Sequence, residues 1–142
     1  ILIVDDYAHH PTEVEATLRS AKSGWDRRII AVFQPHLFSR TKEFFKEFAD
    51  ALQIADIVII TDIYPAREQP IAGITSKLIY DELSITLKDH CHLLSDLDDL
   101  RDKLDDIAQS GDMILTMGAG NIWRYNESYV EHLQSISQGV ES

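Results

Sequence analysis

The chain of 142 residues has one cysteine, few basic residues and no long apolar run. A single cysteine, Cys91, excludes an internal disulfide framework and agrees with a reducing compartment, so we expect a cytoplasmic protein. No apolar run reaches the roughly 20 residues needed to cross a bilayer, so we expect no membrane partner. The 24 acidic residues outnumber the 13 Lys and Arg residues and give a net charge of −11. This disfavours a general nucleic-acid-binding protein, which needs a basic face.

Standard phosphate-binding loops are missing as well. The G-x-x-x-x-G-K-[ST] motif does not occur, and Gly118-Ala119-Gly120-Asn121 lacks the full dinucleotide fingerprint. A glycine turn between a strand and a helix is better explained by chain geometry than by phosphate binding. The chain also opens at Ile1 inside an apolar run, with neither an initiator methionine nor a basic leader. We therefore expect a domain of a longer polypeptide, without its own standard ATP-phosphate site.

Apolar, β-rich runs alternate with amphipathic helical patterns along the whole chain. The expected strands are Ile1–Val4, Ile29–Phe33, Ile57–Ile60 and Met113–Thr116, with His92–Leu94 as a weaker one. Apolar ridges at helical spacing predict five helices, represented by Val14–Ala21, Phe44–Leu52, Leu78–Leu83, Leu97–Ala108 and Ile122–Leu133. Such alternation implies βαβ units with right-handed crossovers. We predict one α/β domain over residues 1–142, a Rossmann-like three-layer fold with a mainly parallel sheet flanked by helices.

Ligands of such sheets bind outside the carboxyl ends of the strands. This rule selects the loops Asp5–His10, Gln34–Arg40, Asp62–Glu68 and Gly118–Asn121, which hold most of the chemically useful side chains. The longest irregular stretch is Thr61–Ile74, and loops of that length in a compact domain are often functional.

Two carboxylates, a phenol and two imidazoles are packed into the turn Asp5-Asp6-Tyr7-Ala8-His9-His10. Adjacent acids can hold Mg²⁺ and histidines can hold zinc, so metal binding is the first hypothesis. Neighbouring residues of a strand point to opposite faces, however, so Asp5 and Asp6 are not expected to share one ion. The alternative is that one Asp caps the turn and one His packs on the start of the helix.

Arg40 follows the second strand and falls in the first turn of the Phe-rich helix. A guanidinium there can bind a carboxylate through two parallel hydrogen bonds. The alternative is an ordinary surface arginine, although cations are disfavoured near a helix amino terminus. Elsewhere, His90-Cys91-His92 has no third ligand nearby in sequence, so we expect no metal there. Asp96–Asp106 is rich in aspartate but keeps leucines at helical spacing, which indicates a solvated helix face.

The first strand with Asp5-Asp6 resembles a response-regulator receiver domain, in which Asp62 would be phosphorylated. That family needs a lysine just after the last strand, where this chain has Thr116-Met117-Gly118-Ala119. It also gives no account of the segment FQPHLFSRT. We therefore rank the receiver domain well below the following resemblance.

Four segments resemble, in the same order, the carboxy-terminal domain of the Mur ligases, and within that family the ligases that join L-alanine to UDP-N-acetylmuramate. They are VDDYAHHPTEVEATL, AVFQPHLFSRTKEFFKEFADAL, DIYPAREQPIAGITS and LTMGAGNI. The resemblance implies an ATP-dependent ligation through an acyl phosphate in peptidoglycan synthesis, on which cell shape and division depend. It also implies an amino-terminal UDP-sugar domain and a central ATPase domain, both absent from this chain. Mg²⁺ would be held mainly by that central domain, and the isolated domain should be inactive.

The same resemblance implies roles for single residues. Asp6 would accept hydrogen bonds from the ATP ribose, and Tyr7 and His9 would line the cleft near the nucleotide and the incoming amine. His9 is the catalytic candidate. His36 and Arg40, with Tyr7, would bind the alanine carboxylate, with Arg40 as the principal anchor. No metal ligand is implied in this domain.

The chain departs from the family pattern at two positions. Many relatives have an arginine where this chain has Leu37, so fewer charges would hold the carboxylate here. An acid often stands where this chain has Asn121, to which we assign no role. A related ligase that recycles the muropeptide L-alanyl-γ-D-glutamyl-meso-diaminopimelate shares the His-His-Pro motif and is the second candidate. A non-enzymatic, acidic partner-binding module is the third.

Overall fold

The five strands form one parallel sheet. The computed structural model describes residues 1–141, with side chains as far as Ser137. The strand order is β1-β5-β2-β3-β4, and each neighbouring pair is parallel. The strands are β1 (Leu2–Asp6), β2 (Ile29–Phe33), β3 (Ile57–Thr61), β4 (Cys91–Leu94) and β5 (Met113–Met117). This confirms the predicted α/β fold with a parallel sheet, including the weak strand at His92–Leu94.

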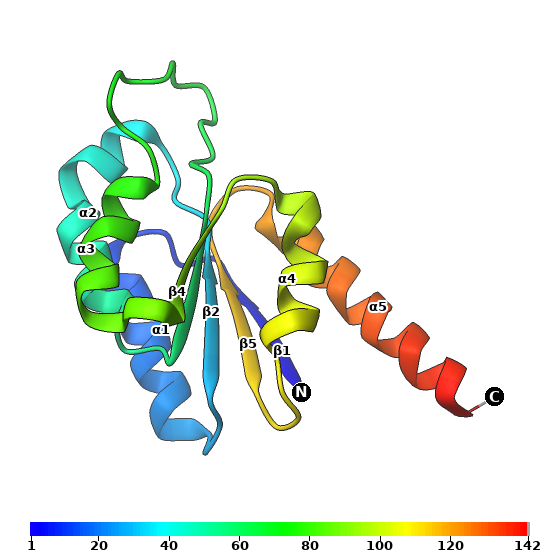
Figure 1. The fold of residues 1–142 in the computed structure, drawn as a ribbon. Coiled ribbons are helices and arrows are strands. Elements are labelled where there is room, and N and C mark those ends of the chain that lie inside the picture. The colour runs from blue at the N-terminus through cyan, green and yellow to red at the C-terminus, as the bar shows by residue number, and fades with distance from the viewer. Residues whose placement is uncertain (142) are drawn as a thin grey trace.

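Helices cover both faces of the sheet and complete three layers (Figure 1). One face carries α1 (Pro11–Gly24), α2 (Phe38–Leu52) and α3 (Lys77–Leu87). The other carries α4 (Leu100–Ile107) and α5 (Ile122–Glu141). The fourth helix begins later than expected, because Leu97–Asp99 forms a short 3₁₀ turn started by an Asp96 side chain that accepts a hydrogen bond from the Asp98 amide. None of the helices in the stretch 1–141 has the length and apolar character needed to span a membrane.

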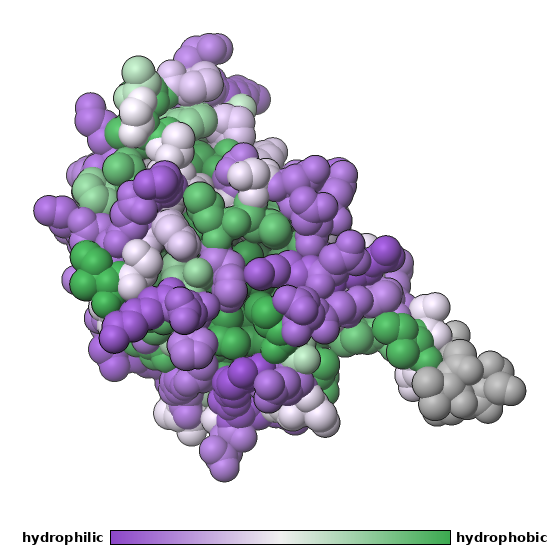
Figure 2. All heavy atoms as spheres, in the orientation of Figure 1, coloured by the Kyte–Doolittle hydropathy of each residue, from purple (hydrophilic) through white to green (hydrophobic). Residues whose placement is uncertain are grey.

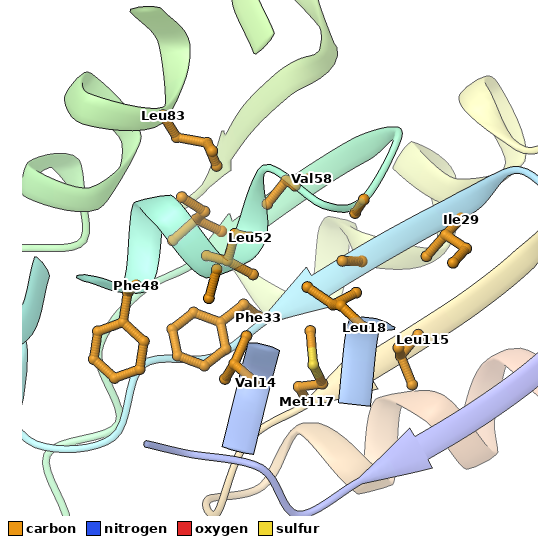
Figure 3. Close-up of a cluster of buried hydrophobic side chains, with 14 of the residues drawn as sticks. Val14, Leu18, Ile29, Phe33, Phe48, Leu52, Val58, Leu83, Leu115 and Met117 are labelled. Atoms are coloured by element: carbon orange, nitrogen blue, oxygen red, sulfur yellow. The ribbon is translucent and has the colours of Figure 1, made fainter. Parts of the chain in front are cut away.

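Two apolar cores lie on either side of the sheet, because the strand residues alternate between its faces. Along β2, Ala31 and Phe33 face α1–α3, whereas Ile30 and Val32 face α4 and α5. The ring of Phe33 lies 5.0 Å from that of Phe48 in the first core, which Figure 3 shows in close-up. β2, β3 and β5 are buried along their whole length. That explains their continuous apolar sequences.

The outer surface of α4 is the solvated face that the sequence predicted. Its leucines Leu100 and Leu104 are buried in the second core, and the aspartates between and around them are exposed. Figure 2 shows predominantly hydrophilic side chains over this part of the molecule.

An ion pair joins the amino-terminal ends of β2 and β5, opposite the predicted ligand edge. Arg28 donates to both carboxylate oxygens of Asp112, over 3.1 Å from Nε and 2.6 Å from Nη2. Burial alone would raise the pKa of Asp112, but the hydrogen bonds from Arg28 and from the Gln109 amide outweigh burial and lower it. The Asp112 side chain is only 5% exposed, so the pair is a buried one on the acid's side.

We expect Asp112→Asn to lower the free energy of unfolding by about 2 kcal/mol at pH 7, because Arg28 loses a charged, hydrogen-bonded partner. The pKa of Asp112 in the folded chain lies below its ordinary value of 3.8, so this stabilisation is present above that value. It disappears as the pH falls through the lowered pKa. Urea unfolding at pH 7 and near pH 3 measures the difference, which should shrink at the lower pH.

Glu15→Gln is the matched control, because it removes a carboxylate from an exposed pair with Arg19 at 2.9 Å. Its expected effect is below about 0.5 kcal/mol. An equal loss for the two variants would contradict a special role of the Arg28–Asp112 pair.

Candidate functional site

The two carboxylates at the end of β1 point to opposite faces of the sheet, as strand geometry predicted. Asp5 accepts a 2.7 Å hydrogen bond from the Thr116 hydroxyl, which itself accepts one from Asn126 of α5. Asp6 accepts a 2.8 Å hydrogen bond from the Ala8 amide and lines an apolar groove of about 300 Å³ beside α1. These two residues therefore do not share an ion. Within residues 1–141 no group of three or more His, Cys, Asp or Glu side chains is placed to hold a metal.

His10 and Glu13 build the start of α1. The His10 ring accepts a hydrogen bond from the Thr12 amide and lies 5.0 Å from the ring of Phe44. Glu13 accepts hydrogen bonds from the amides of His9 and His10. Both bonds lower the pKa of Glu13, and the bond from His9 has the larger effect. One histidine of the pair thus packs on the start of the helix, as the alternative interpretation of this turn predicted.

His9 has a different environment, which sets its tautomer. Its Nδ1 lies 2.9 Å from the Tyr7 carbonyl oxygen. A carbonyl oxygen can only accept, so Nδ1 carries the proton and the neutral ring has its lone pair on Nε2. His9 can therefore take up a proton at Nε2.

Four rings from three loops form a continuous row. The ring of Tyr7 lies 5.2 Å from that of His9, and His9 lies 6.0 Å from His36. The His36 ring in turn stacks on Tyr64 at 5.7 Å, with an angle of 25° between the planes. The row crosses the carboxyl ends of β1, β2 and β3, which confirms that these loops meet at one edge of the sheet.

His36 and Arg40 present buried polar atoms that lack protein partners. Neither Nδ1 of His36 nor Nη1 of Arg40 has a hydrogen-bond partner among the described residues. Burial, and next the positive charge of Arg40, lower the pKa of His36, so the imidazole is neutral at pH 7. A buried donor without a partner costs about 1–3 kcal/mol. The arrangement is therefore suited to an anionic ligand that accepts a hydrogen bond from Arg40 and, in the tautomer with the proton on Nδ1, a second one from His36.

The loop between β3 and α3 contributes residues that sequence reasoning missed. Tyr64 exchanges backbone hydrogen bonds with Pro35 and Leu37, on either side of His36. Glu68 accepts hydrogen bonds from the amide and the hydroxyl of Ser39, next to Arg40. The sequence pointed to this segment only as a whole, through its length, its place after a strand and the family resemblance of DIYPAREQPIAGITS, and it assigned no role to Tyr64 or Glu68.

The glycines after β5 are explained by close packing. A Cβ atom on Gly120 would lie 2.5 Å from Cγ of Tyr64, and one on Gly118 would lie 3.0 Å from the Gln34 carbonyl oxygen. Gln34 also donates to the Asn121 side chain over 2.7 Å and accepts from the Ile122 amide. Chain geometry accounts for this turn, as expected, and Asn121 helps to hold it.

Asp62 lies outside the row of rings. It lines a separate cavity of about 170 Å³ with Phe38, Ile63, Thr75 and Ser76. Receiver domains have the strand order 2-1-3-4-5, with β1 inside the sheet, whereas β1 is an edge strand here. The structure therefore does not favour the receiver interpretation.

Sequence comparisons point to a single family. Residues 1–120 match the family model described as Mur ligase, glutamate ligase domain. The chain is 51% identical over 138 residues to UDP-N-acetylmuramate–L-alanine ligase of Geotalea daltonii, and 49% identical over 134 residues to that of Geotalea uraniireducens. Each alignment covers 94% of this chain and 29% of the relative, so the chain spans about 29% of the length of these relatives.

Solved structures agree with this result. The chain superimposes on UDP-N-acetylmuramate-alanine ligase of Thermotoga maritima with a TM-score of 0.74 and 32% identity, over 94% of this chain and 26% of that one. A second match is a domain of a protein from Haemophilus ducreyi, provisionally assigned as UDP-N-acetylmuramate:L-alanyl-γ-D-glutamyl-meso-diaminopimelate ligase. Its TM-score is 0.66 and its identity 26%, over 92% of this chain and 89% of that one. The chain therefore belongs to the Mur ligase family, as the motifs predicted, and corresponds to the part described as the glutamate ligase domain.

Proposed function

We propose that residues 1–142 are the amino-acid-binding, carboxy-terminal domain of an ATP-dependent ligase that joins L-alanine to UDP-N-acetylmuramate in peptidoglycan synthesis. The observation that carries this proposal is the pair of unpartnered buried groups on His36 and Arg40. The carboxylate of an amino acid would accept a hydrogen bond from each and would pair with the guanidinium. The names of the relatives at about 50% identity support alanine as the amino acid.

The rest of the reaction requires parts of the protein outside this chain. The matched relatives are about three times as long, which leaves room for a UDP-sugar domain and an ATPase domain. The side chains of Asp5 and Asp6 point to opposite faces of the sheet, so they do not form a paired carboxylate site for Mg²⁺, which would be held mainly by the ATPase domain. Because the reaction consumes ATP and a UDP-sugar, we expect it in the cytoplasm.

Asp6 and Tyr7 are the proposed contacts to the nucleotide. One carboxylate oxygen of Asp6 holds the Ala8 amide, which leaves the other to accept hydrogen bonds from a ribose diol. The Tyr7 side chain is 69% exposed at the same edge, where its ring can contact the nucleotide and the amino acid. These two residues would close the ATP site from the side of this domain.

The proposed chemistry uses His9 as a base. ATP gives its γ-phosphoryl group to the muramate carboxylate, and ADP leaves. The alanine ammonium loses one proton to Nε2 of His9, and the free amine attacks the acyl carbon. The tetrahedral intermediate then expels phosphate, which carries away the second proton lost by the nitrogen, and leaves the neutral amide. Arg40 and His36 would supply positioning by holding the carboxylate next to the reacting nitrogen.

Arg40→Ala in the full-length ligase should lower kcat/KM for alanine by roughly 10- to 100-fold, since a charged, hydrogen-bonded contact to the substrate is lost. Arg40→Lys keeps the charge but not the paired donors, so its kcat/KM for alanine should lie between those of the wild type and of Arg40→Ala. Steady-state phosphate release with varied alanine measures both. An unchanged kcat/KM for alanine contradicts the anchor role.

A higher kcat/KM for L-alanyl-γ-D-glutamyl-meso-diaminopimelate than for alanine in the wild type favours the recycling ligase.

His9→Asn should lower kcat about 100-fold or more, because the amide can still donate to the Tyr7 carbonyl but offers no base at the Nε2 position. His10→Asn is the control, since asparagine is a good helix cap and His10 points to Phe44. Equal kcat values for the two variants would remove His9 from the proposed mechanism.

The 142-residue chain alone should form no amide when given ATP, alanine and UDP-N-acetylmuramate. The reason is that it carries one half of the proposed site and no standard phosphate loop. Product detection by mass spectrometry, with the full-length ligase as positive control, measures this. Turnover by the chain alone contradicts the proposed division of the site.

A further inference from the structure

The first turn of α2 begins without a cap of its own. Leu37 at the N-cap position offers no side-chain acceptor, and the first turn contains no acidic residue. Arg40 adds a positive charge at the positive end of the helix dipole. By local sequence alone, the segment that carries Arg40 is therefore poorly held in place.

Glu68 provides this cap from the loop between β3 and α3. One carboxylate oxygen accepts a 3.1 Å hydrogen bond from the Ser39 amide, and the other accepts from the Ser39 hydroxyl. The bond from that hydroxyl is the largest of the effects that lower the pKa of Glu68, and the charge of Arg40 adds to them. Glu68 is thus an ionised acid at the start of α2, beside the proposed carboxylate anchor.

The same loop also forms a hydrogen bond with the strained backbone at Leu37, which precedes Arg40. Leu37 has φ of 74°, a conformation that leucine rarely adopts. The Leu37 amide donates a 2.9 Å hydrogen bond to the Tyr64 carbonyl. The Leu37 carbonyl accepts hydrogen bonds from the amide and the hydroxyl of Thr41. A hydrogen bond from the Glu68 amide to the Pro65 carbonyl closes the turn between Tyr64 and Glu68. Two points of one turn therefore fix both ends of the segment from His36 to Arg40.

We propose that Glu68 is a positioning residue for the amino-acid site: it caps α2 from the Thr61–Ile74 loop and so fixes Arg40 relative to His36. This rests on the proposed function of Arg40 and His36. It gives the long loop a role in amino-acid binding without direct contact to the substrate. The bond geometry matters more than the charge, because the negative charge of Glu68 by itself opposes binding of a carboxylate.

Two substitutions separate geometry from charge. Glu68→Ala removes the cap and the charge, whereas Glu68→Gln removes the charge and keeps an oxygen that can accept from the Ser39 amide. In the full-length ligase, we expect Glu68→Ala to raise the KM for alanine roughly tenfold, with kcat and the KM values for ATP and UDP-N-acetylmuramate nearly unchanged. Glu68→Gln should restore the KM to within about threefold of the wild type. If charge alone mattered, both variants would bind alanine more tightly.

Asp96→Ala is the matched control, because Asp96 also caps a helical turn through a backbone amide, at 2.9 Å, but next to α4. It should leave the KM for alanine unchanged. An unchanged or lowered KM for alanine in Glu68→Ala overturns the proposal.

A titration of the 142-residue chain tests Glu68 independently of catalysis. Glu68 raises the pKa of His36 through its charge, while burial and Arg40 lower it. NMR titration should therefore show a lower His36 pKa in Glu68→Gln than in the wild type, and faster amide exchange at Ser39 in Glu68→Ala. If the full-length ligase does not use alanine, the proposed function fails while this result stands. If neither the His36 pKa nor the Ser39 exchange changes, Glu68 has no positioning role.

Discussion

The insertion of β5 between β1 and β2 is the constraint on which the rest of the structure depends. Its register places Met117 beside both Asp6 and Phe33, the last residues of the neighbouring strands. The three strands therefore end at the same level, and the loops that follow start from one line. Backbone hydrogen bonds from Gln34 to Met117 and from Gly118 to Asp6 extend this alignment past the strands. Tyr7, His9 and His36 of the row of rings stand within a few residues of these aligned ends, and Tyr64 follows β3, which pairs with β2 at Phe33 and Ile60.

The proposed carboxylate contact at this edge uses one cation, Arg40. The chain has a net charge of −11, so a cation that binds a carboxylate must be protected from the many acids around it. The proposed anchor is one guanidinium, that of Arg40, and beside it stands the imidazole of His36, whose pKa is lowered first by burial and then by that guanidinium. A neutral His36 can donate a hydrogen bond without adding a second charge to be neutralised when no substrate is bound. The proposed site would thus combine one positive charge with a directed donor, which suits a small zwitterion better than a polyanion.

The sequence was sufficient for the elements whose formation is local. Continuous apolar runs identified β2, β3 and β5, and the opposite directions of Asp5 and Asp6 followed from the period of a strand. The places of Tyr64 and Glu68 could not be derived in this way, because their contacts join residues 28 or 29 positions apart through a loop of irregular backbone. The positive φ of Leu37 was equally inaccessible, since leucine gives no sign of a conformation that is imposed by Tyr64 and Thr41.

The turn between β1 and α1 holds two sets of polar groups. Tyr7 stands 69% exposed, and a second oxygen of Asp6 and the Nε2 lone pair of His9 are not used in building the turn. In contrast, the polar atoms that set the turn itself, in Glu13 and His10, are occupied by backbone amides. A turn that only connected β1 and α1 would need the contacts of Glu13 and His10 alone. The groups on Tyr7, Asp6 and His9 are those to which the proposed function assigns contacts with substrate, and under that proposal the Nδ1–Tyr7 contact leaves Nε2 of His9 as the atom that would accept the proton.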